Sequence, residues 1–519
     1  MIRTPRLALA GLVFAVSVAG AADLPRTPTG TVPSPAPRDT TWWAPGALPG
    51  TPRGGVPGAG RIRGGALMRT VTRLARPELK GRLAGSPGYM RAAREMAEAL
   101  RAAGLKPAGD DGYFQKLNVE YNEVLDAGLE LVPRDGPGRA LKLGPDFACR
   151  GLTGSGDLTA PVVFAGYGVS RPEQGYDDYA GLDAKGKVVL AFKEAPPFRV
   201  DSAGWGGSTL PRPKARAAAR HGARALLIVP VPGQEHPQKP IASMLEGDGP
   251  QDENFPVMQV DESVARELLR AAGLDPADLK ARIDSTKSPD SHTLPVSVHV
   301  RVKARYHASQ ASVNVVALLP GADPKLRQEY VVVGAHLDHV GSQGDSLYFP
   351  GANDNASGSA AVLELARAFA GTEPCARSII FALFSSEEAG LYGARRFVER
   401  PPVPAERIVA YVNMDCVGHG DSIQVGGGKS YPRLWSVARD LDSASGRRMV
   451  EATWAGGGAD AAPFEEAHIP NLYFASKFSY THLHLPTDTP STLNRPLFEA
   501  LARLAYGTVW TLAGGGAAR

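Results

Sequence analysis

The sequence predicts an α/β protein: a mostly parallel, mixed sheet sandwiched by helices, with a β-rich segment inserted into it. From about residue 312 onward, short and continuously apolar runs alternate with helical patterns, which is typical of parallel strands buried on both faces. Between about residues 132 and 302, strand-like segments rich in Gly and Pro dominate instead. This change of pattern indicates a separate unit within the chain.

The first predicted element is helical and covers about residues 62–104. Apolar side chains recur there at i, i+3, i+4 and i+7, and Gly104 supplies a stop. The four residues with this spacing are Ala93, Met96, Ala97 and Leu100. In the β-rich unit we expect strands at 162–164, 187–192 and 225–229, with a short helix at 214–221 that ends at Gly222.

The last part of the chain carries the predicted parallel sheet. Its strands are expected at 330–334, 378–384, 408–414 and 471–475, and a helix at 358–370. No internal repeat is visible in the sequence.

Composition narrows the class of protein. The 519 residues are 43% hydrophobic and 21% charged, enough for a large buried core, and the length suggests about two to four domains. The formal net charge of +4 is small for this size, so it indicates no partnership with nucleic acid. Five arginines gather early in the chain without interleaved aromatic residues, and we interpret them as a solvated helix face: Arg61, Arg63, Arg69, Arg73 and Arg76.

The N-terminus resembles a secretory signal. Arg3 and Arg6 precede an apolar run at 7–19, and residues 19–21 (Ala-Gly-Ala) fit a cleavage site. We therefore predict a signal peptide at 1–21, a Pro/Gly-rich linker at 22–61, and export to a periplasm or to the medium. The run is too short to span a bilayer comfortably, so we expect no stable membrane insertion.

Three cysteines are widely spaced: Cys149, Cys375 and Cys416. They form neither a disulfide framework nor a CxxC metal pattern, and we interpret them as buried small apolar side chains. A bridge between Cys375 and Cys416 in an oxidising compartment stays open at this point.

Metal-ligand residues follow the predicted parallel strands. His336 and Asp338 come after the first strand, and Glu387 and Glu388 after the second. Asp415, His484 and, in a loop before a helix, Asp354 complete the set. Because active sites in open α/β sheets form beyond the carboxyl ends of the strands, we expect these side chains at one edge.

Four of these residues are acids that would repel one another if grouped without cations: Asp354, Glu387, Glu388 and Asp415. Bound divalent metal is the natural compensation. Imidazole and carboxylate without thiolate favour Zn²⁺, with Mn²⁺ or Co²⁺ as substitutes. Two ions need a bridging carboxylate and would hold a hydroxide nucleophile between them, while one free carboxylate takes the proton. The adjacent Glu387 and Glu388 suit this division.

Five segments together resemble one known family, the two-zinc exopeptidases of peptidase family M28, which include bacterial leucyl aminopeptidases and glutamate carboxypeptidase. The segments are 334–341 (GAHLDHVG), 351–358 (GANDNASG), 386–394 (SEEAGLYGA), 412–415 (VNMD) and 484–489 (HLPTDT). The resemblance covers roughly residues 66–130 and 303–515, and it implies a zinc-exopeptidase fold of the phosphorylase/hydrolase-like type.

The resemblance also implies roles for single residues. His336 and Asp415 would complete one zinc site, Glu388 and His484 the other, and Asp354 would bridge the two ions. Glu387 would be the general base. Asp338 would orient His336 from behind.

The sequence departs from the family pattern in two places. The family often has Ser-Asp-His before the last strand, where this chain has Ala-Asp-Ala at 459–461. His482 is a rival for His484, but the His-x-Pro-x-Asp-Thr context favours His484. We expect His339 to lie behind the ligands or to be structural.

The β-rich unit resembles a protease-associated (PA) domain in four segments: 164–168 (FAGYG), 176–183 (YDDYAGLD), 186–190 (GKVVL) and 255–257 (FPV). We therefore divide the mature chain into peptidase parts at 62–131 and 303–515 with a PA domain at 132–302. The insertion is either structural or a lid that narrows access to the zinc cleft.

The predicted function is hydrolysis of N-terminal residues from peptides by an exported di-zinc aminopeptidase. A carboxypeptidase or a glutaminyl-cyclase-like activity is the alternative on the same fold. A non-catalytic, receptor-like binding protein is a third reading, but such a protein would be expected to lose ligands or the base, and here they are all present.

Overall fold

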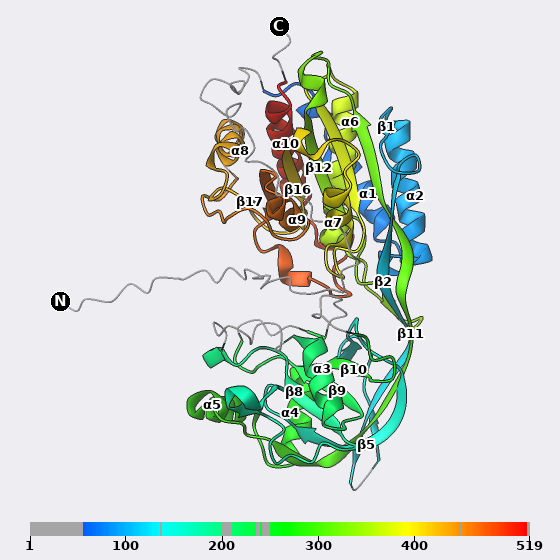
Figure 1. Ribbon diagram of the computed structural model, residues 1–519, viewed down its shortest axis with the longest axis vertical. Coiled ribbons are helices and arrows are strands. Elements are labelled where there is room, and N and C mark those ends of the chain that lie inside the picture. Colours follow the sequence, from blue (N-terminus) through cyan, green and yellow to red (C-terminus); the bar gives the residue numbers. More distant parts are fainter. Residues whose placement is uncertain are drawn as a thin grey trace, which may run out of the picture. The chain divides into compact units, whose positions relative to one another are not determined.

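A computed structural model describes residues 55–134, 137–199, 210–234, 239–240, 250–446 and 448–515 (Figure 1). The predicted signal peptide at 1–21 and the linker as far as residue 54 lie outside the described residues. Within the described ranges, every helix is too short or too polar to cross a bilayer.

The last part of the chain forms a mostly parallel sheet. Its strand order is β17-β18-β16-β12-β15-β11, and β18, β16, β12 and β15 run parallel while the two outer strands run antiparallel to their neighbours. The parallel strands are β12 (Tyr330–His336), β15 (Ser378–Phe384), β16 (Ile408–Met414) and β18 (Asn471–Ser476). The outer ones are β17 (Ile423–Gly426) and β11 (His292–Leu319). Every residue of β15 is buried, as the continuous apolar run requires.

Helices cover both faces of this sheet. Val331 and Val333 of β12 point to one core and Val332 to the other, because side chains alternate along a strand. The larger core receives α1 (Gly64–Leu74), α2 (Pro87–Ala102), α6 (Gly358–Ala370), α8 (Pro432–Ser445) and α10 (Arg495–Leu512). The smaller core receives α7 (Tyr392–Glu399) and α9 (Ala461–Glu466).

The β-rich unit has its own strand order, β11-β5-β8-β9-β10-β4. Its strands are β5 (Gly156–Phe164), β8 (Val188–Phe192), β9 (Ala225–Val229), β10 (Val257–Val260) and β4 (Phe147–Cys149). One face packs on α4 (Glu262–Arg270) and α5 (Pro276–Thr286), and the other on α3 (Pro211–Arg220). This unit therefore has cores separate from those of the parallel sheet.

Two long strands belong to both regions. β2 (Phe114–Pro133) pairs with β11 along almost its whole length, from Phe114 opposite Val315 to Pro133 opposite Val296. β11 contributes Val313 and neighbours to the core of the parallel sheet and Val298 and neighbours to the core of the β-rich unit. The predicted domain boundaries at 131/132 and 302/303 fall inside these two strands and remain predictions.

The predicted α/β fold is confirmed, and the strands at 378–384 and 408–414 and the helix at 358–370 have the predicted bounds. All three cysteines are buried and free, so the bridge between Cys375 and Cys416 is not formed.

Candidate metal centre

The predicted ligand residues meet at the carboxyl edge of the parallel sheet. His336 is the last residue of β12, Asp415 directly follows β16, and Glu388 lies in the turn after β15. Asp354 precedes α6, and His484 lies in the loop after β18. Because the strands are parallel, their ends bring residues far apart in the chain into one buried cluster.

One group of donors consists of His336, Asp354 and Asp415. His336 Nε2 lies 3.2 Å from Asp354 Oδ1 and 3.5 Å from Asp415 Oδ1. The Tyr473 hydroxyl donates a hydrogen bond of 2.7 Å to the other oxygen, Asp415 Oδ2. Asp415 Oδ1 is thereby turned toward His336, and it has no hydrogen-bond donor among the described residues.

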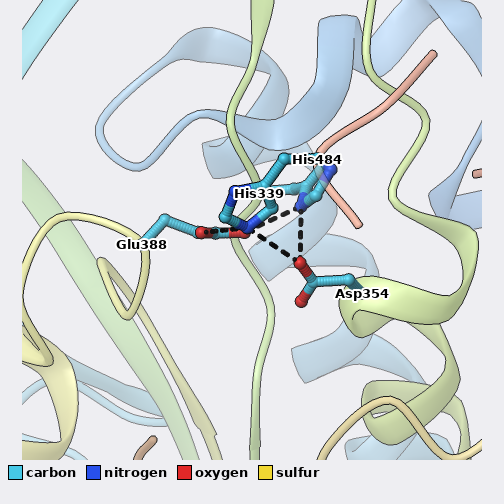
Figure 2. A group of neighbouring side chains, drawn as sticks. All are labelled: His339, Asp354, Glu388 and His484. Carbon is cyan, nitrogen blue, oxygen red and sulfur yellow. Dashed lines mark hydrogen bonds and ion pairs between the residues drawn. The ribbon is translucent and has the colours of Figure 1, made fainter. Parts of the chain in front are cut away.

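A second group consists of His339, Asp354, Glu388 and His484, and Figure 2 shows their side chains converging. His484 Nε2 lies 2.8 Å from Glu388 Oε2 and 3.1 Å from Asp354 Oδ2. His339 Nδ1 lies 2.8 Å from Glu388 Oε1 and 3.6 Å from Asp354 Oδ2. The rival His482 is outside this group: its Nδ1 is paired with Thr487 Oγ1 at 2.9 Å.

Asp354 connects the two groups through its separate carboxylate oxygens. Oδ1 is the atom near His336, and Oδ2 is the atom near His484 and His339. The Asp488 carboxylate holds the backbone here, since it accepts the N–H groups of Asn353 at 2.8 Å and Asp354 at 3.0 Å. A carboxylate with one oxygen on each side can bridge two cations.

Glu387 lies beside the first group without joining its closest contacts. Its Oε2 is 4.0 Å from His336 Nε2, and the side chain is almost completely buried. Burial, followed by the nearby charges of Glu388, Asp460 and Asp415, raises the pKa of Glu387 well above its usual range, against the opposing effect of His336. A buried carboxyl group with a raised pKa beside a donor cluster can take up and release a proton.

Asp338 connects the strand ends. Its Oδ1 accepts the N–H of Glu387 at 3.2 Å, and its Oδ2 accepts the N–H of Glu388 at 3.3 Å. Its Oδ1 is 3.8 Å from His336 Nδ1, while the Asp338 carbonyl oxygen is closer to that nitrogen, at 3.3 Å. Asp338 thus fixes the turn that carries both glutamates as well as lying next to His336.

The charges of the cluster fit a metal site. Burial alone would lower the pKa of His336 and His484, but the surrounding carboxylates raise both well above the usual value. In the same way the histidines hold the pKa of Asp354 well below its usual range, although burial opposes this. Imidazole and carboxylate groups at these separations are ligands typical of a zinc site. Asp415 Oδ1, which has no hydrogen-bond donor among the described residues, is available to bind a cation.

Sequence reasoning missed some residues that hold this site together. Arg82 is fully buried, and its guanidinium donates to the carbonyl oxygens of Leu337, next to His336 in the chain, at 3.0 Å and of Gly351, three residues before Asp354, at 2.9 Å. Asp488 was present in the last motif, and its position four residues after His484 was the available signal. Arg82 had no such signal, because its partners are backbone carbonyls, most of them distant in the chain.

Asp460, in the segment where the sequence departs from the family pattern, is completely buried. Neither of its carboxylate oxygens has a hydrogen-bond donor among the described residues. Burial, together with Asp338, Asp415 and Glu388, raises its pKa well above the usual value, although His336 opposes the shift. It adds a further acid to the cluster.

Fold and cluster together define an α/β protein that gathers metal donors at the carboxyl edge of a parallel sheet. Comparison with known families matches residues 314–509 to Peptidase family M28 and residues 158–268 to the PA domain. Residues 314–509 thus form a region of the peptidase M28 type, and residues 158–268 form a PA domain inserted ahead of it.

Curated relatives agree with this assignment. Aminopeptidase YwaD of Bacillus subtilis is 25% identical over 445 residues, which cover 83% of this chain and 80% of that protein. A probable leucine aminopeptidase of Arthroderma otae is 27% identical over 209 residues, which cover 38% of this chain. The match spans only 57% of that fungal protein.

Solved structures show the same fold. A peptidase M28 precursor from Shewanella amazonensis has a TM-score of 0.63 at 18% identity, over 88% of this chain and 96% of that one. An aminopeptidase from an Aneurinibacillus strain has a TM-score of 0.60 at 20% identity, over 87% and 94% of the two chains. Both matches extend over the parallel sheet and the β-rich unit.

Proposed function

We propose that this protein is an exported zinc aminopeptidase that removes residues one at a time from the N-terminus of peptides. The observation that supports it is the position of the Asp354 carboxylate, whose two oxygens face two different groups of buried histidines and carboxylates. Such an arrangement suits a pair of cations. Relatives named as aminopeptidases support the choice of reaction.

In this proposal each zinc has its own donors. His336, Asp354 and Asp415 would hold one ion, and Asp354, Glu388 and His484 the other. When bound, the ions polarise a scissile carbonyl and make a water molecule acidic enough to attack at neutral pH. Mn²⁺ or Co²⁺ would be the substitutes expected from this donor set.

Glu387 would serve as the general base. Its carboxylate lies near His336 Nε2 yet makes none of the shortest donor contacts, which leaves it available to accept a proton from the attacking water. The same group then gives that proton to the leaving amine, so one residue acts first as base and then as acid. Asp338 would keep Glu387 in place through its bond to the Glu387 N–H.

The decisive experiment compares Glu387→Gln with wild type on a leucine anilide, on a free peptide and on the same peptide blocked at its N-terminus. We expect Glu387→Gln to retain zinc but to lose on the order of 10²–10⁴-fold in kcat, the usual contribution of general acid–base catalysis. Wild type should cleave the free peptide from its N-terminus and leave the blocked one intact.

A matched control is Glu364→Gln, which changes a buried glutamate on α6 that is paired with Arg367 at 2.6 Å. This variant should keep wild-type kcat. Cleavage of the blocked peptide from its C-terminus, or near-normal turnover by Glu387→Gln, would contradict the proposed reaction or base.

Export is tested on the N-terminus of the protein secreted from cells that express the full sequence. Cleavage after the Ala-Gly-Ala segment at 19–21 is expected. Recovery of the intact N-terminus inside the cells alone would contradict export.

A further inference from the structure

His339 lies among the donors of one metal position and has no role in the function proposed above. Its ring is completely buried, and its Nδ1 faces Glu388 Oε1 and Asp354 Oδ2 (Figure 2). The other ring nitrogen, Nε2, is buried without a hydrogen-bond partner among the described residues. All close polar contacts of this ring are therefore made by Nδ1, toward the donor group.

The separations between donor atoms fit a single ion. Donors that each lie about 2.1 Å from one zinc are separated by about 3.0 Å at a right angle and about 3.4 Å at the tetrahedral angle. Around this position the observed separations are 2.8 Å and 3.6 Å for His339, and 2.8 Å and 3.1 Å for His484. His339 thus faces the same two carboxylates as His484, with Glu388 Oε1 as its nearest atom where His484 has Glu388 Oε2.

Contacts with Gly351 and Arg82 fix the position of His339. Gly351 has a φ of +57°, and a Cβ atom there would lie 2.5 Å from His339 Cδ2, so the ring packs on a position that only glycine can fill. The backbone is held from the other side, because the His339 N–H donates to the Arg82 carbonyl oxygen at 3.2 Å. The Arg82 guanidinium donates in turn to the Gly351 carbonyl oxygen.

We propose that His339 Nδ1 coordinates the ion that Asp354, Glu388 and His484 hold. This inference rests on the proposed zinc function. It makes the two positions unequal: one has four protein donors, His339, Asp354, Glu388 and His484, and the other has three, His336, Asp354 and Asp415. Sites closed by four protein ligands hold zinc structurally, whereas sites with three keep an open position.

The different numbers of protein donors should affect both the retention of the two ions and the place where a substrate or water can bind. The four-donor position retains its ion under chelation, and the three-donor position loses its ion first. The open coordination place lies on the side of His336 and Glu387, next to the proposed base.

The test starts with the wild-type protein loaded with two zinc ions and measures the number of imidazole ligands by X-ray absorption spectroscopy. Three imidazoles per two ions are expected if His339 coordinates, and two if it does not. Because this measurement needs no variant, it remains decisive even if a substitution at His339 prevents folding.

The variant His339→Ala is then compared with His482→Ala by zinc competition against a chelator. In His339→Ala the tighter of the two binding steps should weaken by more than about 100-fold, beyond the 10–100-fold typical of residues that only support a ligand. His482→Ala should bind both ions as wild type does, since its ring is paired outside the group.

Two imidazoles per two ions in wild type, or a loss below 10-fold in His339→Ala, would overturn the proposal. These outcomes leave the aminopeptidase untouched. A wild-type protein that binds no zinc, or that binds two ions without releasing N-terminal residues, would instead defeat the proposed function.

Discussion

Buried ionisable groups occur in both regions of this molecule, but their hydrogen bonding differs. In the PA domain the ammonium of Lys214 is completely buried and donates to three backbone carbonyls, those of Phe192 at 2.7 Å and of Lys193 and Glu194 at 2.8 Å. Asp178, equally buried, accepts the Val169 N–H and the Tyr176 hydroxyl, both at 2.9 Å. The chain itself satisfies these groups.

At the carboxyl edge of the parallel sheet, several buried polar atoms are left without a hydrogen-bond partner among the described residues. They include Asp415 Oδ1 and both carboxylate oxygens of Asp460. Leaving a buried charge uncompensated is costly, so such a cluster persists where something outside the chain completes it. Burial alone therefore does not mark a functional site; among the described residues, buried carboxylate oxygens without a hydrogen-bond donor occur at this edge of the sheet.

The largest effect that would sharpen this contrast is expected from Asp354→Ala with and without zinc. This change removes a donor from both metal positions, so activity should fall to the level of chelator-treated wild type. A ligand present at 100 times its Kd stabilises a fold by about 2.7 kcal/mol, and the variant should lose this zinc-dependent increment in thermal unfolding. A variant that still gains stability from zinc would show that Asp354 is not shared by the ions.

In the PA domain, Lys214→Met is expected to lower stability without changing the effect of zinc. It leaves three buried carbonyls without their donor and should lower the free energy of unfolding by about 3–5 kcal/mol in a denaturant titration. The increment from zinc should stay at its wild-type size. The control is Lys187→Met, which removes a surface ion pair with Asp183 and should cost less than about 1 kcal/mol.

A smaller effect is expected from pH. Burial raises the pKa of Asp178 from its ordinary 3.8 to about 7, although the Val169 N–H, the Tyr176 hydroxyl and Lys214 oppose the shift. The folded state then binds this proton more tightly than the unfolded state. The stabilising contribution is full below about pH 3.8 and is lost as the pH rises to about 7.

Asp178→Asn should therefore flatten the decline in stability between these two pH values, measured by denaturant midpoints across the range. An unchanged slope would mean that the carboxyl is already ionised in the folded protein at low pH. In that case the hydrogen bonds that Asp178 accepts in the PA domain would be made to a charged rather than a neutral carboxyl group.

Much of the fold could be predicted, because strands buried on both faces have continuous apolar sequences, as at 378–384 and 408–414. The meeting of His336, Asp354 and Asp415 follows from the common direction of the parallel strands. β11, of 28 residues, could not be predicted at this length, since three successive exposed residues at 307–309 separate its two apolar stretches. Its pairing with β2 continues on both sides of this exposed stretch.

The place of His339 could not be predicted either. Its ring position depends on the left-handed backbone of Gly351 and on the guanidinium of Arg82, neither of which is close to it in sequence. Local pattern shows which residue types are present, and the three-dimensional path of the loops decides which of them reach the donor group.

The ribbon of β2 and β11 shows a protein engineer where the chain can be shortened. Glu123 and Arg305 stand opposite each other in the ribbon, just before β2 enters the core of the PA domain and just after β11 leaves it. A two-residue type I′ turn can join antiparallel strands at such a pair. The resulting miniature would keep the predicted catalytic residues, and its preference for short or long peptides would separate a gatekeeping insertion from mere scaffolding.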